Sequence, residues 1–164
     1  MKIKKATLKD IDTIQQLAQI IWPHAYSEII SKEQIKYMLN LIYSNTSLTN
    51  QMQKGHKFVL AINENIALGF ASYSIKSKEE PTTFLLHKIY VLPNISKKGI
   101  GSFLLTHVCN AGIKAGAILL ELNVNKYNSA KQFYEKKGFT FLKEEVIDIG
   151  NGYIMDDFVM NKFL

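Results

Sequence analysis

At 164 residues the chain suits one domain with a single hydrophobic core, and we expect that domain to span residues 1–164. Apolar residues make up 47% of the chain, yet no apolar run approaches the roughly 18 residues that a membrane span needs, which excludes an integral membrane protein. The net charge of +6 arises from scattered lysines without a single arginine, so we expect no nucleic-acid partner and a modest positive field that favours a polyphosphate ligand.

The N-terminal third contains three predicted helices. Two capping boxes, at residues 7–10 and 31–34, each precede apolar residues at helical spacing. We expect the first helix to end at Trp22, because the residue before Pro23 avoids the helical region. A third, shorter helix is predicted over residues 47–54, where a glycine follows.

Seven segments have the composition of strands, with polar turns between them. They are residues 2–6, 58–62, 66–74, 82–92, 118–124, 139–149 and 153–162. Short turns at residues 63–65 and 150–152 predict two hairpins. A helix over residues 99–114 connects the fourth strand to the fifth, which we therefore expect to be parallel, and another helix covers residues 127–137.

The central stretch, residues 82–105, reads TTFLLHKIYVLPNISKKGIGSFLL. It predicts a strand buried on both faces, a break at Pro93 and the start of a helix. Gly99 and Gly101 lie where that helix begins, so its unpaired N–H groups could approach a phosphate closely. The Gly-x-Gly pair alone is a weak signal. No third glycine follows, as in the dinucleotide-binding motif, and no Gly-Lys-Ser/Thr, as in a P-loop, so a simple tight turn explains the pair as well.

A second motif lies about thirty residues further on, where the strand at residues 118–124 runs into NKYNSAKQFYEKKGF. Together with the KKGIG loop, it resembles the GNAT superfamily of acetyl-coenzyme-A-dependent N-acetyltransferases over roughly residues 82–142. The closing run GNGYIMDDFVMNKFL is more loosely similar to bacterial spermidine and spermine acetyltransferases. One departure is Ser96, which stands where the family usually has Gln or Arg.

The resemblance implies an α/β (α+β) fold, with a mixed, mostly antiparallel sheet of about seven strands and helices on both faces. The implied order is β-α-α-β-β-β-α-β-α-β-β. It also implies acetyl-CoA as acyl donor, direct attack by a primary amine such as that of a polyamine, and a homodimer. Two alternatives remain open: a protein N-terminal or lysine acetyltransferase, and a non-catalytic acyl-CoA-binding sensor domain.

The expected cofactor contacts lie in the strand end, the loop and the second motif. They are Tyr90, Val91, Ser96, Lys97, Lys98, Gly99, Ile100, Gly101, Ser102, Asn128, Lys131 and Tyr134. Backbone N–H groups of residues 98–102 would hold the pyrophosphate, while Lys97 and Lys98 add charge or are merely solvated. The resemblance implies that backbone groups near Tyr90 and Val91 bind pantetheine and polarise the acetyl carbonyl. It also implies that Asn128 bonds the pantetheine arm, although helix capping would explain that residue too.

Tyr134 is the expected general acid, because a phenol with a pKa of about 10 stays protonated at neutral pH and the family places a tyrosine beside the cofactor sulfur. Core packing is the alternative reading of this residue. Alkyl amines are mostly ammonium at neutral pH, so a base must take a proton before attack. His87 and Glu121 are the candidates, because each lies on one of the two central strands.

The acceptor site is expected near Trp22, His24 and Tyr26, in a stretch that resembles the W-x-x-x-Y of many family members. Their rings could wall an amine pocket through cation–π contact, or simply pack a helix corner. Residues 144–160 hold five acids and no lysine, which predicts a locally negative hairpin with Asp156 among the substrate-binding residues. A solvated hairpin face is the plainer reading.

Cysteine and histidine usage predicts neither a disulfide nor a metal site. Cys109 has no partner for an internal disulfide, and the four scattered histidines show no ligand spacing. The first residues contain no apolar targeting segment, so we expect a cytoplasmic protein.

Overall fold

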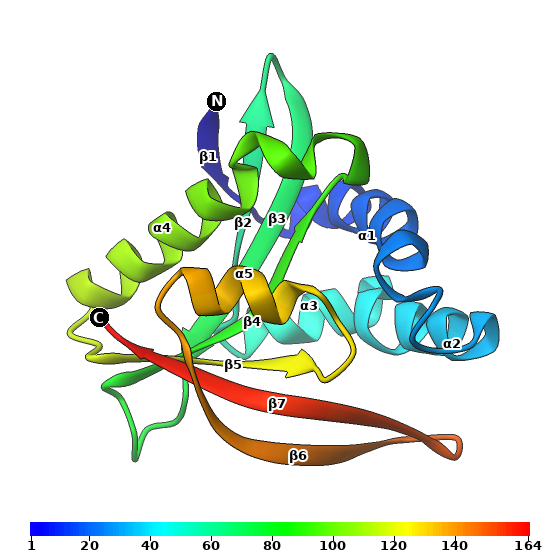
Figure 1. The fold of residues 1–164 in the computed structure, drawn as a ribbon. Helices are drawn as coiled ribbons and strands as arrows, with labels where there is room; N and C mark the ends of the chain where they lie inside the picture. The colour runs from blue at the N-terminus through cyan, green and yellow to red at the C-terminus, as the bar shows by residue number, and fades with distance from the viewer.

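A computed structural model describes residues 1–95 and 98–164, and its seven strands form one sheet. In chain order the elements are β1 (Lys2–Lys5), η1 (Leu8–Asp10), α1 (Ile11–Tyr26), α2 (Lys32–Tyr43), α3 (Asn45–Gln53), β2 (Lys57–Asn63), β3 (Ile66–Ile75), β4 (Thr83–Val91), η2 (Pro93–Lys98), α4 (Ile100–Lys114), β5 (Leu119–Asn125), α5 (Ala130–Lys136), β6 (Thr140–Gly150) and β7 (Tyr153–Phe163). The strand order is β1-β2-β3-β4-β5-β7-β6. β4 and β5 are parallel and the other neighbours antiparallel, which confirms the predicted mixed sheet (Figure 1).

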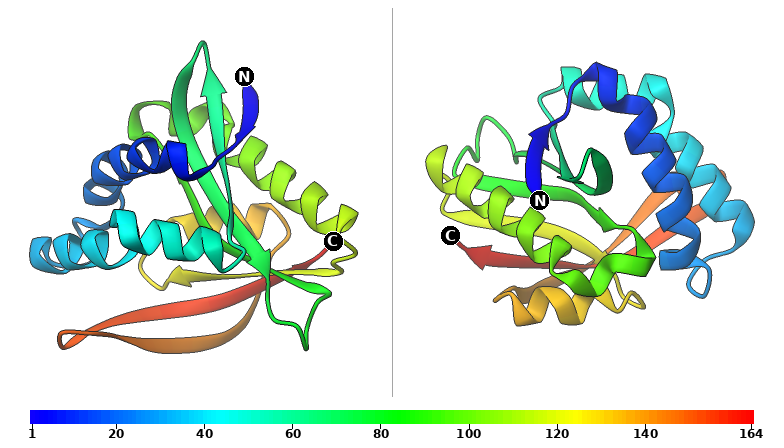
Figure 2. Two further views of the ribbon diagram at one scale, coloured as in Figure 1. Left: turned by 180° about the vertical axis from the view of Figure 1, so that it is seen from behind. Right: turned by 90° about the horizontal axis from the view of Figure 1, so that it is seen from above.

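Helices cover both faces of the sheet, as predicted. α1, α2 and α3 lie on one face, over a core that includes Ile14, Leu48 and Phe70. α4 and α5 lie on the other face, over a core that includes Leu104 and Leu120. Figure 2 shows α1 and α2 on the opposite side of the sheet from α4. Both cores are apolar, so each helical layer removes the part of the sheet that it covers from water, whereas the edge strand β6 stays mostly exposed.

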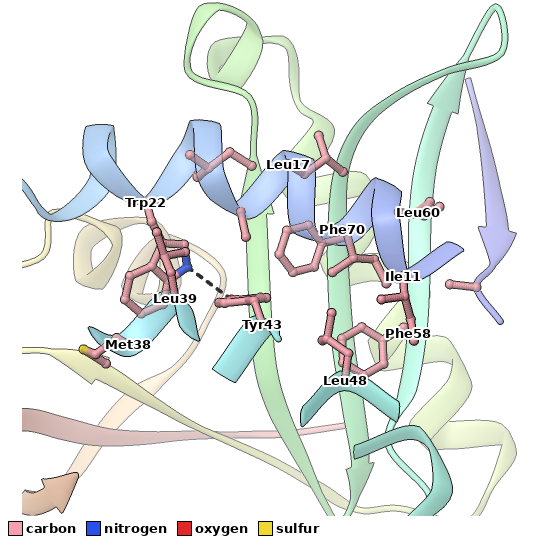
Figure 3. Close-up of a cluster of buried hydrophobic side chains, with 14 of the residues drawn as sticks. Ile11, Leu17, Trp22, Met38, Leu39, Tyr43, Leu48, Phe58, Leu60 and Phe70 are labelled. Carbon is pink, nitrogen blue, oxygen red and sulfur yellow. Dashed lines mark hydrogen bonds between the residues drawn. The ribbon is translucent and has the colours of Figure 1, made fainter. Parts of the chain in front are cut away.

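The prediction that the first helix ends at Trp22 is wrong, because α1 continues through Pro23 to Tyr26. Proline in a helix removes one hydrogen bond and costs about 3 kcal/mol. Trp22 and Tyr26 are only 3% and 5% exposed, with ring centroids 4.5 Å apart, and burying two such rings offsets that cost. Trp22 also donates its Nε1–H to the Tyr43 hydroxyl at 3.2 Å (Figure 3). Tertiary contacts therefore override the local preference.

The long β6–β7 hairpin is anchored to α2 at its tip. The Tyr37 hydroxyl donates to the Ile149 carbonyl at 2.7 Å, and Gln34 Nε2 donates to the Ile154 carbonyl at 3.0 Å. Figures 1 and 2 show the hairpin tip beside α2. Ser31 Oγ accepts the Gln34 N–H at 3.0 Å, so half of the predicted capping box forms while the Gln34 side chain holds the hairpin. The hairpin is thus held under the α1–α2 layer.

Cys109 lies half-buried in α4 against the core, in keeping with a structural role. Burial raises the pKa of its thiol, which makes it a poorer nucleophile.

Within the described part of the chain, no helix is long and apolar enough to cross a membrane.

Candidate functional site

The two central strands begin side by side and then part, which opens a cavity. β4 pairs with β5 only over residues 83–86 and 119–122, although both strands continue further. A cavity of about 650 Å³ lies beyond this paired segment, and residues from α1, β4, α4, β5 and α5 line it. The two parallel strands therefore diverge beyond their paired segment, which leaves one backbone edge of the second half of β4 without a neighbouring strand.

An extra residue in β4 marks the point where the strands diverge. Consecutive residues Ser72 and Tyr73 of β3 pair with Lys88 and Leu86, so His87 between them is a β-bulge. A bulge bends its strand and increases the local twist. The bend carries the second half of β4 away from β5 and turns it along the cavity.

The free edge of β4 presents backbone donors to the cavity. Leu92 donates its N–H to the Leu68 carbonyl of β3 at 2.9 Å. Because successive N–H groups of a strand point to alternate sides, those of Ile89 and Val91 point toward the opening. Tyr90 and Val91 both line the cavity, as expected. The strand can thus bind an extended polar chain through its main chain.

The start of α4 contributes a second set of backbone donors. Gly99 caps the helix with φ of 78°, a left-handed conformation that favours glycine, and the Phe103 N–H closes the first turn on the Gly99 carbonyl at 2.9 Å. Gly101 and Ser102 line the cavity, whereas the Ile100 side chain is buried in the core. The N–H groups of residues 100–102 precede the first intrahelical bond, so they suit an anion.

The lysines of the loop before α4 are not shown to contact the cavity. Lys98 is exposed and does not line the cavity. Ser96 and Lys97 lie outside the described residues, so their contribution to phosphate binding stays a prediction.

α5 brings Tyr134 to the cavity, and the turn before this helix brings Asn128. Tyr134 is buried, and burial together with nearby Tyr26 raises the pKa of its phenol, which keeps it protonated. Asn128 Oδ1 accepts the N–H of the first α5 residue at 2.9 Å, so this side chain caps the turn and lines the cavity at once. Lys131 instead pairs with Glu135 and does not line the cavity.

A pair of phenols forms the wall opposite α5. The Tyr26 and Tyr90 hydroxyls are 2.8 Å apart, and burial raises the pKa of both. Tyr26 and His24 line the cavity, as expected. Trp22 does not line it, and packs behind Tyr26 to fix that ring.

The two predicted bases are poorly suited to accept a proton. His87 lines the cavity, but its pKa falls to about 3, because it is buried and close to the positive charges of His56 and Lys88. Its ring stacks on His56 with centroids 4.0 Å apart, and its Nε2 lies 2.8 Å from Ser74 Oγ. Glu121 does not line the cavity. Its Oε2 forms an ion pair at 3.4 Å with Nζ of Lys76, which lies in the loop between β3 and β4.

Four of the five acids of the hairpin divide between its two faces, and the fifth, Asp148, lies near the hairpin tip, where it accepts the Gly150 N–H at 2.8 Å. Lys126 Nζ lies 3.0 Å from Glu144 and 2.8 Å from Asp156, so one positive charge is shared between these two carboxylates on the α5 side. Asp156 therefore does not line the cavity. Asp157 and Glu145 are direct neighbours on the opposite face, toward α1. The predicted negative surface is thus confined to these two residues near the cavity.

Sequence reasoning missed Asn123 and Lys88, which line the cavity. Asn123 shares a strand face with Glu121 and lies nearer the end of β5, where sites on parallel strands are usual, so strand alternation could have found it. Lys88 has no such signal, because a lysine in a strand is usually solvated. Here burial lowers its pKa to about 8, and it donates to Gln51 Oε1 at 2.6 Å.

Across residues 1–95 and 98–164, no cluster of three or more potential metal ligands occurs.

Comparison with known proteins connects this arrangement with acetyl transfer. The sequence pattern of a family described as acetyltransferase (GNAT) domain matches residues 26–154. A spermidine N(1)-acetyltransferase of Thermoplasma acidophilum is 28% identical over 162 residues, which cover 95% of this chain and 96% of the relative.

Two solved structures extend the comparison to the fold. The PaiA N-acetyltransferase of Thermoplasma acidophilum, in complex with coenzyme A, matches with a TM-score of 0.83 and 27% identity over 99% of this chain and 98% of its own. The ribosomal-protein-S18-alanine N-acetyltransferase of Escherichia coli matches with a TM-score of 0.74 and 18% identity over 99% and 92%, a likeness of fold alone.

Proposed function

The chain belongs to the acetyltransferase (GNAT) family and uses acetyl-CoA, and on that premise we propose that it transfers acetyl directly to a primary amine of a small cationic acceptor such as a polyamine. One observation carries this proposal: the glycine-rich start of α4, the free edge of β4 and Tyr134 all meet at one cavity of about 650 Å³. The acceptor class is supported by the relative named as a spermidine acetyltransferase.

The chain's own groups fit the acyl donor. The N–H groups at the start of α4 would bind the pyrophosphate, with the positive end of the helix dipole behind them. The N–H groups of Ile89 and Val91 face the opening, where they would bind the pantetheine arm and the acetyl carbonyl oxygen. A preorganised N–H aimed at a developing oxyanion is worth about 3 kcal/mol. Acetyl-CoA itself supplies the activated acyl group.

Tyr134 would protonate the leaving sulfur. Its raised pKa keeps the phenol protonated, but makes complete transfer to a thiolate with a pKa of about 8.5 unfavourable by itself. The phenol therefore works best by bonding to the charge that develops on sulfur while it recovers a proton from the reacting nitrogen. This role requires that Tyr134 remain neutral before attack, which its burial ensures.

The acceptor would enter from the α1 side of the cavity. Tyr26, Tyr90 and His24 form this wall, and rings of this kind can stabilise an ammonium group. Glu145 and Asp157 supply negative charge on the neighbouring hairpin face. Asp156 would add only to the general field, because Lys126 neutralises it on the other side.

The test is release of thiol from acetyl-CoA with a panel of polyamines, aminoglycosides, amino acids and peptides with free N-termini. We expect release with polyamines, and a decrease in kcat of about a hundredfold or more in Tyr134→Phe, with unchanged acetyl-CoA binding. Tyr153→Phe is the matched control, because Tyr153 packs against Tyr37 and does not line the cavity. Tight acetyl-CoA binding without release by any amine would refute the proposal and favour a sensor domain.

A further inference from the structure

A carboxylate beside the cavity is buried without a compensating partner. Asp157 of β7 is 6% exposed, and its Oδ1 has no hydrogen-bond partner in residues 1–95 and 98–164. Its Oδ2 lies 3.5 Å from Asn123 Nδ2, a weak contact. No lysine or histidine of the described chain forms an ion pair with it. Buried polar atoms are normally satisfied, so an exception at a cavity points to a role in function.

The location of Asp157 connects it with the cavity. It pairs with Asn125 of β5 and Glu145 of β6, so its side chain lies on the same sheet face as Asn123. Asn123 and Tyr26 both line the cavity, Asn123 is in contact with Asp157, and the Asp157 charge raises the pKa of Tyr26. The carboxylate thus lies directly behind the cavity wall on the side expected for the acceptor.

The charges around Asp157 make its proton affinity suitable for a base. The titratable groups on its own side are Glu145 on β6 and Tyr26 on α1, and the charge of Asp156 acts on it from the opposite face of β7. Burial, together with the smaller effects of the Glu145 and Asp156 charges, raises its pKa to about 6, although the bond from the Asn123 amide opposes this rise. A base with a pKa just below the working pH is ionised and still binds protons well.

We infer that Asp157 is the proton acceptor that converts the acceptor ammonium into the attacking amine, a role that rests on the proposed function. One proton of R–NH₃⁺ moves to Oδ1 through a water molecule beside Asn123 and Tyr26, because Asp157 itself does not line the cavity. The lone pair of R–NH₂ then forms the C–N bond, and the C–S bond breaks with its electron pair going to sulfur. Tyr134 gives its proton to sulfur and regains one from the nitrogen, so the amide keeps one N–H. Asp157 finally releases its proton to water.

The other candidate bases are weaker or occupied. His87 has a pKa of about 3 and Asp157 of about 6, so Asp157 holds a proton about a thousandfold more tightly. Glu121 is tied to Lys76 in the segment where β4 and β5 are still paired, before the cavity opens. Asp157 is therefore the acid residue whose position and proton affinity both suit the step.

The test compares pH profiles of kcat/KM for wild type and Asp157→Asn. With spermidine, wild type should reach a plateau above about pH 6, because the active base is the ionised form. In Asp157→Asn, kcat/KM should be about a hundredfold or more lower than in wild type. It should keep rising with pH toward the pKa of the amine itself, about 10. Glu145→Gln should move the wild-type limb to lower pH, because it removes a charge that raises the Asp157 pKa.

A second acceptor separates this role from damage to the fold. In a spermidine analogue with two fluorine atoms on the carbon β to each terminal nitrogen, the terminal amines are largely neutral at the assay pH, so they need no base before attack and Asp157→Asn should retain far more activity toward it. Glu144→Gln, the same charge change on the far face of the hairpin, should leave both profiles within about twofold of wild type.

Two outcomes would overturn the inference. An equal loss toward both acceptors, or an acid limb that persists in Asp157→Asn, would remove Asp157 from proton transfer while leaving the acetyltransferase function intact. If wild type transferred acetyl to no amine, the proposed function would fail and this role with it.

Discussion

Replacing Asp157 by asparagine should stabilise the fold by an amount that grows with pH. The pKa of Asp157 is raised from 3.8 to about 6, chiefly by burial. Because the folded state holds this proton more tightly than the unfolded chain, its stabilising contribution is complete below about pH 4 and is lost as pH rises through 6. The difference of about two pKa units, at about 1.4 kcal/mol each, amounts to about 3 kcal/mol.

The assay is urea unfolding of wild type and Asp157→Asn at several pH values between about pH 4 and pH 8. Any change in packing or hydrogen bonding caused by asparagine is independent of pH, so it cancels when values at different pH are compared. The free energy of unfolding of the variant minus that of wild type should increase by about 3 kcal/mol across this range.

A difference that stays constant with pH would refute the reasoning, because it would mean that ionising Asp157 costs nothing in the folded state. Glu145→Gln provides a second check. It removes a neighbouring negative charge, so it should make the pH-dependent part smaller. The expected gain in stability, set against the expected loss of activity, is the usual exchange at a functional site.

Two glycines and one tyrosine give further expectations. Gly69→Ala would place a Cβ 2.5 Å from the Tyr90 carbonyl oxygen, so we expect a loss of about 1–3 kcal/mol in urea unfolding and weaker acetyl-CoA binding. Gly101→Ala meets only ordinary contacts, the nearest at 3.5 Å, so calorimetry should find weaker acetyl-CoA binding while urea unfolding finds no loss of stability. Tyr37→Phe removes the bond to the Ile149 carbonyl, which should cost about 1 kcal/mol and raise KM for the amine but not for acetyl-CoA. An unchanged amine KM would show that the hairpin tip does not position the acceptor site.

Local sequence signals were sufficient for most of the architecture. Apolar periodicity located the helices and strands within a few residues, and the turn at residues 63–65 forms the predicted hairpin. Gly99 was identified correctly as the start of α4, because its left-handed backbone is a local requirement. The homodimer implied by the resemblance stays a prediction.

Two site residues that a local motif identifies lie at the cavity, whereas the two that were chosen only for their strand are poorly suited as bases. Tyr134 and Asn128 line the cavity as expected, since each follows from its position in a motif. His87 and Glu121 were chosen because they lie on the central strands, and strand membership alone gives neither depth nor partners. Burial gives His87 its low pKa, and Lys76 from the loop between β3 and β4 pairs with Glu121.

The sequence by itself determined the order of elements, the backbone donors at α4 and the family to which the chain belongs, because these depend on neighbouring residues. Only the tertiary structure decided which hairpin acid lies on the sheet face of Asn123, behind the cavity wall. Asp156 and Asp157 are adjacent and chemically identical, yet strand alternation puts them on opposite faces and the register across β5, β7 and β6 fixes which face is which. One carboxylate therefore meets Lys126 and the other is buried near Tyr26, a difference that arises from pairing over long range.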